Sequence, residues 1–128
     1  MNMKSTLMTL LTMICSILCC NGQSFNSVDV TEFAKVIKAK SVIILDVRTA
    51  EEYADGHIKG AKNIDVLKDS FGKEALKALP KDKTIALYCR SGRRSKTAAE
   101  ILSKKGYKVI ELNTGYLGWT DAGKETVK

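Results

Sequence analysis

Proline, histidine and aromatic residues are scarce in this 128-residue sequence, which has one proline, one histidine and 6% aromatic residues. With only nine glycines as well, it cannot be collagen-like or a low-complexity chain. Its 45% hydrophobic content is too high for a disordered chain. The length suits one domain with one buried core. We therefore expect a single compact domain with one functional site.

Cysteine is scarce beyond the first 20 residues. Three of the four cysteines, Cys15, Cys19 and Cys20, lie in that first segment, so the rest of the chain has only Cys89. A lone thiol excludes a disulfide framework, a cysteine-based zinc site and a thioredoxin-type pair of thiols. A cysteine protease would need the single histidine, His57, as a base, and no sequence feature places it beside Cys89.

The first 22 residues have the features of an export leader. Lys4 precedes a mostly apolar run from Leu7 to Leu18, and a polar stretch follows it. The run is shorter than the roughly 18 apolar residues of a membrane span, so we expect a removable leader. Two processing routes fit the sequence: cleavage after Gly22, or attachment of a lipid to Cys20 as in bacterial lipoproteins. Both predict an exported protein, either periplasmic or lipid-anchored at the membrane surface.

The remaining chain alternates between helical and strand-like patterns. Asp29 can cap a helix with Glu32 three residues later. Short apolar runs rich in β-branched residues are typical of strands buried on both faces, and these runs lie at 42–45, 84–88 and 108–112. Helical patterns cover 30–37, 50–54, a segment through 75–79 that stops at Pro80, and 95–105. Strands separated by helices predict an α/β fold with a parallel sheet.

We divide the chain accordingly. The expected segments are a signal segment at 1–22, a short tether at 23–27, one domain at 28–123 and a tail at 124–128. In an open parallel sheet, ligands bind beyond the carboxyl ends of the strands. The loop that follows the predicted strand 84–88 is therefore the first place to look for a site.

Arginine is rare, and its placement is uneven. Three of the four arginines, Arg90, Arg93 and Arg94, lie within five positions next to Cys89. Guanidinium groups and the N–H groups of a helix N-terminus both favour the thiolate over the thiol. Gly92 can adopt a positive φ angle, which would turn successive N–H groups inward to form an anion-binding nest. These features indicate a nucleophilic cysteine, although a lone cysteine is commonly just a small buried hydrophobe.

This loop and three further blocks resemble the rhodanese family of single-domain sulfurtransferases, over roughly residues 29 to 119. The matching blocks are Leu45-Asp46-Val47-Arg48, then Glu52-Tyr53 with Gly56-His57-Ile58 and Gly60-Ala61, then the loop 89–95, and finally Leu112 with Gly115 and Trp119. The resemblance implies a rhodanese-like parallel sheet flanked by helices. Thr114 departs from the family pattern, which often has a glycine at this position.

The resemblance also implies a reaction. Cys89 would take a sulfane sulfur from a donor such as thiosulfate, become a persulfide, and pass the sulfur to a thiophilic acceptor such as cyanide or a thiol. Neither a metal ion nor an organic cofactor is implied. Substrate contacts would come from Arg90, Ser91, Gly92, Arg93 and Arg94. Structural support would come from Asp46, Arg48, Glu52 and His57, with ion pairs between Arg48 and the carboxylates.

Two other functions remain as alternatives. Cysteine-based phosphatases and arsenate reductases place five residues between the cysteine and an arginine. Here that place belongs to Ser95, and Arg94 arrives one position early. The shorter loop suits a sulfur atom better than a phosphate group. A rhodanese-like binding module without activity would usually lack the cysteine or the loop charges, and this chain has both.

The net charge of +7 favours anionic partners. We expect a small anionic sulfur donor and a thiophilic acceptor, and no nucleic acid, because no aromatic residues interleave with the scattered lysines. A lone low-pKa thiol in an oxidising space would need a stored persulfide, or a thiol or thioredoxin-like reductant. Membrane contact is expected only through a lipid on Cys20. We expect a monomer, because no apolar stripe is left over.

Overall fold

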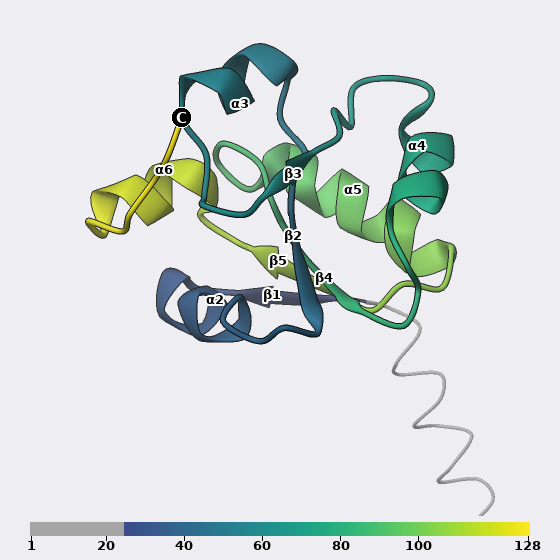
Figure 1. The fold of residues 1–128 in the computed structure, drawn as a ribbon, viewed down its shortest axis with the longest axis horizontal. Helices are drawn as coiled ribbons and strands as arrows, with labels where there is room; N and C mark the ends of the chain where they lie inside the picture. Colours follow the sequence, from purple (N-terminus) through teal and green to yellow (C-terminus); the bar gives the residue numbers. More distant parts are fainter. Residues whose placement is uncertain (1–24) are drawn as a thin grey trace, which may run out of the picture.

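The computed structural model describes residues 25–128 and contains a five-stranded parallel sheet (Figure 1). The predicted leader and Cys20 lie outside the described residues. The strand order is β1-β5-β4-β2-β3. The strands are β1 (Asn26–Val28), β2 (Val42–Asp46), β3 (Lys62–Asn63), β4 (Thr84–Tyr88) and β5 (Val109–Leu112). The predicted α/β class with a parallel sheet is confirmed.

Helices cover both faces of the sheet. They are α2 (Val30–Val36), α3 (Ala50–Asp55), α4 (Phe71–Ala78), α5 (Arg93–Lys104) and α6 (Gly115–Asp121). One core cluster joins the sheet to α4 and α5, and the other joins it to α2 and α6. Within residues 25–128, no helix is long and apolar enough to span a membrane.

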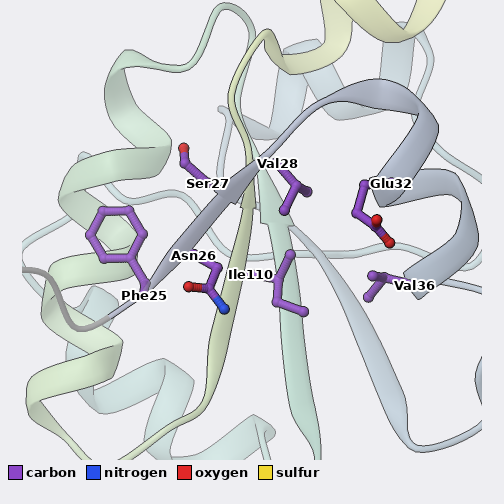
Figure 2. Close-up of a pocket in the computed structure, with 7 residues that line it drawn as sticks. All are labelled: Phe25, Asn26, Ser27, Val28, Glu32, Val36 and Ile110. Carbon is purple, nitrogen blue, oxygen red and sulfur yellow. The ribbon is translucent and has the colours of Figure 1, made fainter.

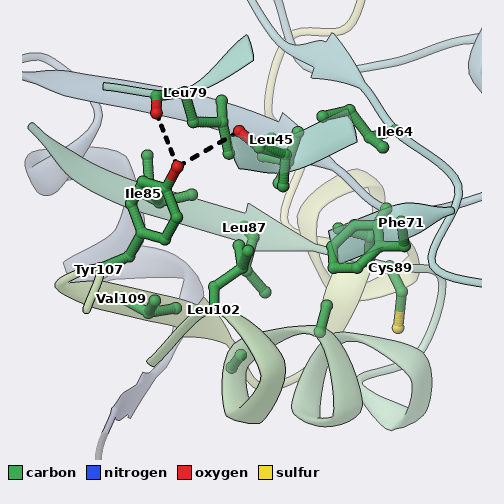
Figure 3. Close-up of a cluster of buried hydrophobic side chains, with 14 residues drawn as sticks. Leu45, Ile64, Phe71, Leu79, Ile85, Leu87, Cys89, Leu102, Tyr107 and Val109 are labelled. Atoms are coloured by element: carbon green, nitrogen blue, oxygen red, sulfur yellow. Dashed lines mark hydrogen bonds between the residues drawn. The ribbon is translucent and has the colours of Figure 1, made fainter. Parts of the chain in front are cut away.

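The alternation of side chains along β4 sets the position of Cys89. Successive strand residues point to opposite faces, so Ala86 and Tyr88 pack with α2 and α6. Ile85 and Leu87 point to the α4 and α5 face, and Cys89 continues that series. Figure 3 shows Cys89 at one end of this cluster, with its sulfur pointing away from the other labelled side chains. The strand thus delivers the thiol to the side of the sheet where α5 begins.

Three elements were not predicted, and each is irregular or short. β1 and β3 have three and two residues, too few to show a periodic pattern. β1 includes Asn26 and Ser27, which the sequence analysis placed in the tether. Helix α6 contains Gly115 and Gly118, and glycine disfavours helix, so tertiary packing of the buried Trp119 has to hold it.

A buried ion pair fixes the turn after β2. Arg48 donates to both carboxylate oxygens of Asp46, with a shortest distance of 2.6 Å, and the two side chains are 4% and 0% exposed. The same guanidinium donates to the Gly56 carbonyl at 2.7 Å, which ties down the end of α3. Asn63 of β3 donates its side-chain amide to the carbonyls of Asp46 and Arg48. This pair therefore links β2, α3 and β3.

Breaking this pair should strongly destabilise the fold. Arg48→Ala leaves the Asp46 carboxylate buried without its partner, so we expect the free energy of unfolding to fall by about 3–5 kcal/mol. Urea denaturation of the wild type and the variant measures this change. Arg93→Ala, which removes an exposed arginine, is the matched control and should change stability by less than about 0.5 kcal/mol. Equal effects from the two substitutions would contradict a structural role for the pair.

Candidate functional site

The loop after β4 curls around the sulfur of Cys89. The Gly92 N–H donates to Sγ at 3.1 Å, and Gly92 has a φ of 99°, the left-handed conformation expected from the sequence. This turn also starts α5, which begins at Arg93, two residues before the predicted start. Cys89 is 1% exposed, so the sulfur lies at the bottom of the loop. The loop therefore holds the thiol at the N-terminus of a twelve-residue helix.

Two close backbone approaches keep the loop in this shape. A Cβ on Gly92 would lie 2.1 Å from the Asn113 carbonyl oxygen, and one on Gly115 would lie 2.4 Å from the Arg90 carbonyl oxygen. The N–H groups of Tyr116 and Leu117 donate to the carbonyls of Cys89 and Arg90, at 2.8 and 3.0 Å. The segment from the end of β5 to the first turn of α6 is thus packed and hydrogen-bonded against the loop.

The surroundings of Cys89 favour its ionisation. Burial disfavours the thiolate, but hydrogen bonds from the Ser95 side chain and from the N–H groups of Ser95, Gly92 and Ser91 outweigh it. The pKa of Cys89 is therefore lower than its ordinary value. Oriented hydrogen bonds are the main cause of this shift, whereas the sequence analysis also counted on the neighbouring arginines.

The three arginines of the loop have different surroundings. Arg94 donates hydrogen bonds from Nη1 and Nη2 to the two carboxylate oxygens of Glu52 in α3, at 2.7 and 2.9 Å. This bidentate pair lowers the pKa of Glu52 to about 2 and raises the pKa of Arg94. Arg90 and Arg93 are exposed. The expected ion pair between Arg48 and Asp46 is present, but Glu52 pairs with Arg94 and not with Arg48, because α3 places its carboxylate beside the start of α5.

The side chain of His57 contacts Tyr53 of α3. Its Nδ1 lies 2.9 Å from the Tyr53 carbonyl oxygen, and its ring stacks on the Tyr53 ring with centroids 3.7 Å apart. Its backbone pairs with Val127 near the C-terminus. These contacts anchor the end of α3 to the last residues of the chain.

A shallow hollow of about 240 Å³ lies beside the loop. Its lining includes Tyr116, whose ring packs against the Arg48 guanidinium at 4.2 Å from the ring centroid. The complete lining is Arg48, Glu52, Asp55, Gly56, Arg90, Tyr116 and Leu117. The hollow offers a mixture of charges and one aromatic face next to the loop.

A larger hollow of about 540 Å³ lies between β1 and α2 (Figure 2). It is lined by Phe25, Asn26, Ser27, Val28, Glu32, Val36 and Ile110. This lining has neither a cysteine nor a basic side chain. The smaller hollow, whose lining includes the basic side chain of Arg90 in the loop, is therefore the better candidate for a substrate site.

A buried carboxylate near the loop was not predicted from the sequence. Glu111 of β5 is fully buried and accepts a hydrogen bond from Ser95 Oγ at 2.5 Å. Ser95 Oγ also lies 3.4 Å from the Cys89 sulfur. Ser27 of β1 donates to the other oxygen of Glu111, and Lys96 Nζ lies 3.5 Å from the carboxylate. The available signal was a glutamate inside an apolar strand that was expected to be buried.

Comparison with known proteins agrees with this architecture. The family model of the rhodanese-like domain matches residues 29–122. Thiosulfate sulfurtransferase PspE of Escherichia coli is 42% identical over 57% of this chain and 68% of its own length. Thiosulfate sulfurtransferase GlpE of Shewanella oneidensis is 30% identical over 77% of this chain and 96% of its own length.

Solved structures give the same result. The crystal structure of a rhodanese-related protein from Thermoplasma volcanium matches with a TM-score of 0.71 and 31% identity, over 80% of this chain and 98% of that one. Some relatives are longer proteins, since the chain spans 66% of a relative from Schizosaccharomyces pombe and 32% of one from Pelagibacter ubique. The chain belongs to the rhodanese-like domain family, and its relatives support a general sulfurtransferase role.

Proposed function

We propose that this protein is a thiosulfate sulfurtransferase that carries the transferred sulfur as a persulfide on Cys89. The observation that carries this proposal is the hydrogen-bonded thiol, which accepts the Gly92 N–H at 3.1 Å beyond the carboxyl end of a parallel strand. A thiol held in this way is available as a thiolate nucleophile near neutral pH. The relatives named thiosulfate sulfurtransferases support thiosulfate as the donor class.

The proposed reaction has two displacement steps. The Cys89 thiolate attacks the outer sulfur of thiosulfate, an S–S bond forms to Cys89, and the S–S bond of the donor breaks. Sulfite leaves with the bonding electron pair, and the terminal sulfur of the persulfide carries the negative charge. An acceptor such as cyanide or a thiolate then attacks that terminal sulfur, and the Cys89 thiolate is the leaving group. Charge is conserved in each step, so no oxidant or cofactor is required.

The loop supplies what these steps need. The exposed Arg90 and Arg93 attract an anionic donor, and the inward N–H groups of Ser91 and Gly92 stabilise negative charge on the sulfur atoms. The mixed hollow beside Arg90 gives the acceptor a place to approach the loop. A phosphatase reaction is disfavoured because Ser95, not an arginine, occupies the sixth position after Cys89 and lies 3.4 Å from its sulfur.

We also propose that the protein is exported through the predicted leader at 1–22 and acts as a monomer. This part of the proposal rests on the sequence pattern. Mass spectrometry of the exported protein tests the export. A chain beginning at Gln23 supports cleavage after Gly22, and a diacylated chain beginning at Cys20 supports a lipoprotein. A chain that keeps Met1 and stays inside the cell would contradict export.

Sulfur loading is the direct test of the proposed chemistry. After treatment with thiosulfate, the intact mass of the wild type should increase by one sulfur atom, and cyanide should remove it again. Cys89→Ser keeps the size of the side chain but lacks the nucleophile, so its mass should not change. Loading of both proteins, or of neither, would contradict a persulfide on Cys89.

The charge near the loop should control donor binding. Glu52→Gln removes the carboxylate that partly neutralises Arg94, and since the pKa of Glu52 is about 2, that carboxylate is ionised throughout a normal assay range. We expect the KM for thiosulfate to fall about threefold at low salt and the difference to disappear at high salt.

The matched control for this variant is Glu51→Gln. Glu51 is an exposed neighbour on the same helix, so the change in net charge is identical. Steady-state kinetics at two ionic strengths would show whether the position of the charge matters. The same KM in both variants would argue against a role for the Glu52–Arg94 pair in donor binding.

A further inference from the structure

Glu111 is a buried charged side chain that the sulfur-transfer steps do not use. It lies on β5 and is 0% exposed. Its two oxygens accept hydrogen bonds from Ser27 of β1 and Ser95 of α5. Its nearest cation is Lys96, whose ammonium lies 3.5 Å away and whose side chain is 51% exposed. The carboxylate is therefore well supplied with hydroxyl donors but only weakly neutralised.

Ser95 connects this carboxylate to the thiol. Its Oγ lies 2.5 Å from Glu111 Oε2 and 3.4 Å from Cys89 Sγ. A serine hydroxyl has one proton to donate. While Ser95 donates to the carboxylate, it offers Cys89 only a lone pair, which suits a thiol S–H. When Cys89 is a thiolate, Ser95 donates its hydroxyl proton to the sulfur instead. Glu111 then has to bind a different proton.

We propose that Glu111 is a positioning residue that accepts the proton of the Cys89 thiol through Ser95, so that the thiol and the carboxylate share one proton. In this transfer the S–H bond breaks and the proton goes to Ser95 Oγ, while the proton of Ser95 goes to Glu111 Oε2. The thiolate then accepts hydrogen bonds from Ser95 and from the Gly92 N–H. Cys89, Ser95 and Glu111 together carry one negative charge before and after the transfer. The inference rests on the proposed function only for its use in catalysis.

Electrostatic repulsion favours one negative charge shared by Cys89 and Glu111 over a separate negative charge on each. A thiolate and a carboxylate separated by a single hydroxyl repel each other in a buried environment, and such pairs lose their protons in two coupled steps. Hydrogen bonding alone would not require a charge here, because a glutamine could accept from Ser27 and donate to Ser95. An ionisable group at this position is what a proton acceptor needs.

Other charged groups face the pair from several elements. The loop and α5 contribute positive charges, α3 contributes the carboxylate that neutralises Arg94, and the segment after β3 contributes a carboxylate that interacts with Arg94. The β2 pair of Asp46 and Arg48 is internally neutralised. Arg94 interacts with Cys89, Glu52 and Asp65. Lys96 lies 3.5 Å from Glu111, and Arg90 and Arg93 are near Cys89 in the sequence. Substitution at Glu111 leaves all of these unchanged.

The test is a pH titration of the Cys89 thiolate without any sulfur donor. Thiolate ultraviolet absorbance is measured against pH, with Cys89→Ser as the baseline that removes the tyrosine signal. The wild type should ionise in two steps, the first with the charge shared and the second with both groups charged. Glu111→Gln should ionise in one step, with a midpoint at least about one pH unit below the upper step of the wild type.

A matched variant controls for the loss of charge. Glu100→Gln removes an exposed carboxylate from the same helix as Ser95 and should titrate like the wild type. Identical single-step titrations of wild type and Glu111→Gln would overturn the proposal. If Glu111→Gln does not fold, Ser95→Ala serves instead. Ser95→Ala removes the hydroxyl that links Cys89 to Glu111, and this hydroxyl is also a hydrogen-bond donor to the thiolate. Cys89 should therefore ionise in one step, at a higher pH than the first step of the wild type.

Sulfur loading of the same proteins separates this inference from the proposed function. If the titration shows two steps but thiosulfate does not load the wild type, the shared proton stands and the proposed donor reaction fails. If thiosulfate loads Cys89 but wild type and Glu111→Gln titrate identically, the shared proton fails and sulfur transfer stands.

Discussion

The close contact between Gly92 and the Asn113 carbonyl is the constraint on which the site depends. Only a residue without a Cβ can turn with a φ of 99° at this distance from the Asn113 carbonyl. The turn points the Gly92 N–H at the sulfur and starts α5 in the same step. The position of the thiol, its hydrogen bonds and the direction of the helix all follow from this single conformation.

The start of α5 works against ordinary helix preferences. Its first turn has two arginines, no acidic residue and no side-chain cap, although helix N-termini favour negative charge. Helix α3 shows the usual arrangement, with a capping box formed by Thr49 and Glu52. Glu52 thus caps its own helix and also supplies the negative charge that α5 lacks, through Arg94. Local helix preferences are broken at the loop where we propose that the anionic donor binds, and a neighbouring helix compensates.

Apolar patterns were enough to predict much of the fold. The strand at 84–88 matches β4 residue for residue, and Asp29 caps α2 as expected. The loop could be found because three arginines gather beside one cysteine. Short edge strands and a glycine-containing helix have no such pattern. The contacts of Glu52 and Glu111 join positions 42 and 16 residues apart, so they become visible only when the sheet order is known.

The position of β1 means that the functional unit begins earlier than the recognisable domain. The rhodanese-like match starts at residue 29, yet Ser27 lies before it and holds one oxygen of the buried carboxylate. Within residues 25–128, β1 is an edge strand of the sheet and pairs only with β5. A protein trimmed to the family boundary would lose an edge strand and leave Glu111 with one hydroxyl partner fewer. A chain that begins at residue 29 would therefore carry the whole family match and still have an altered hydrogen-bond network around Glu111.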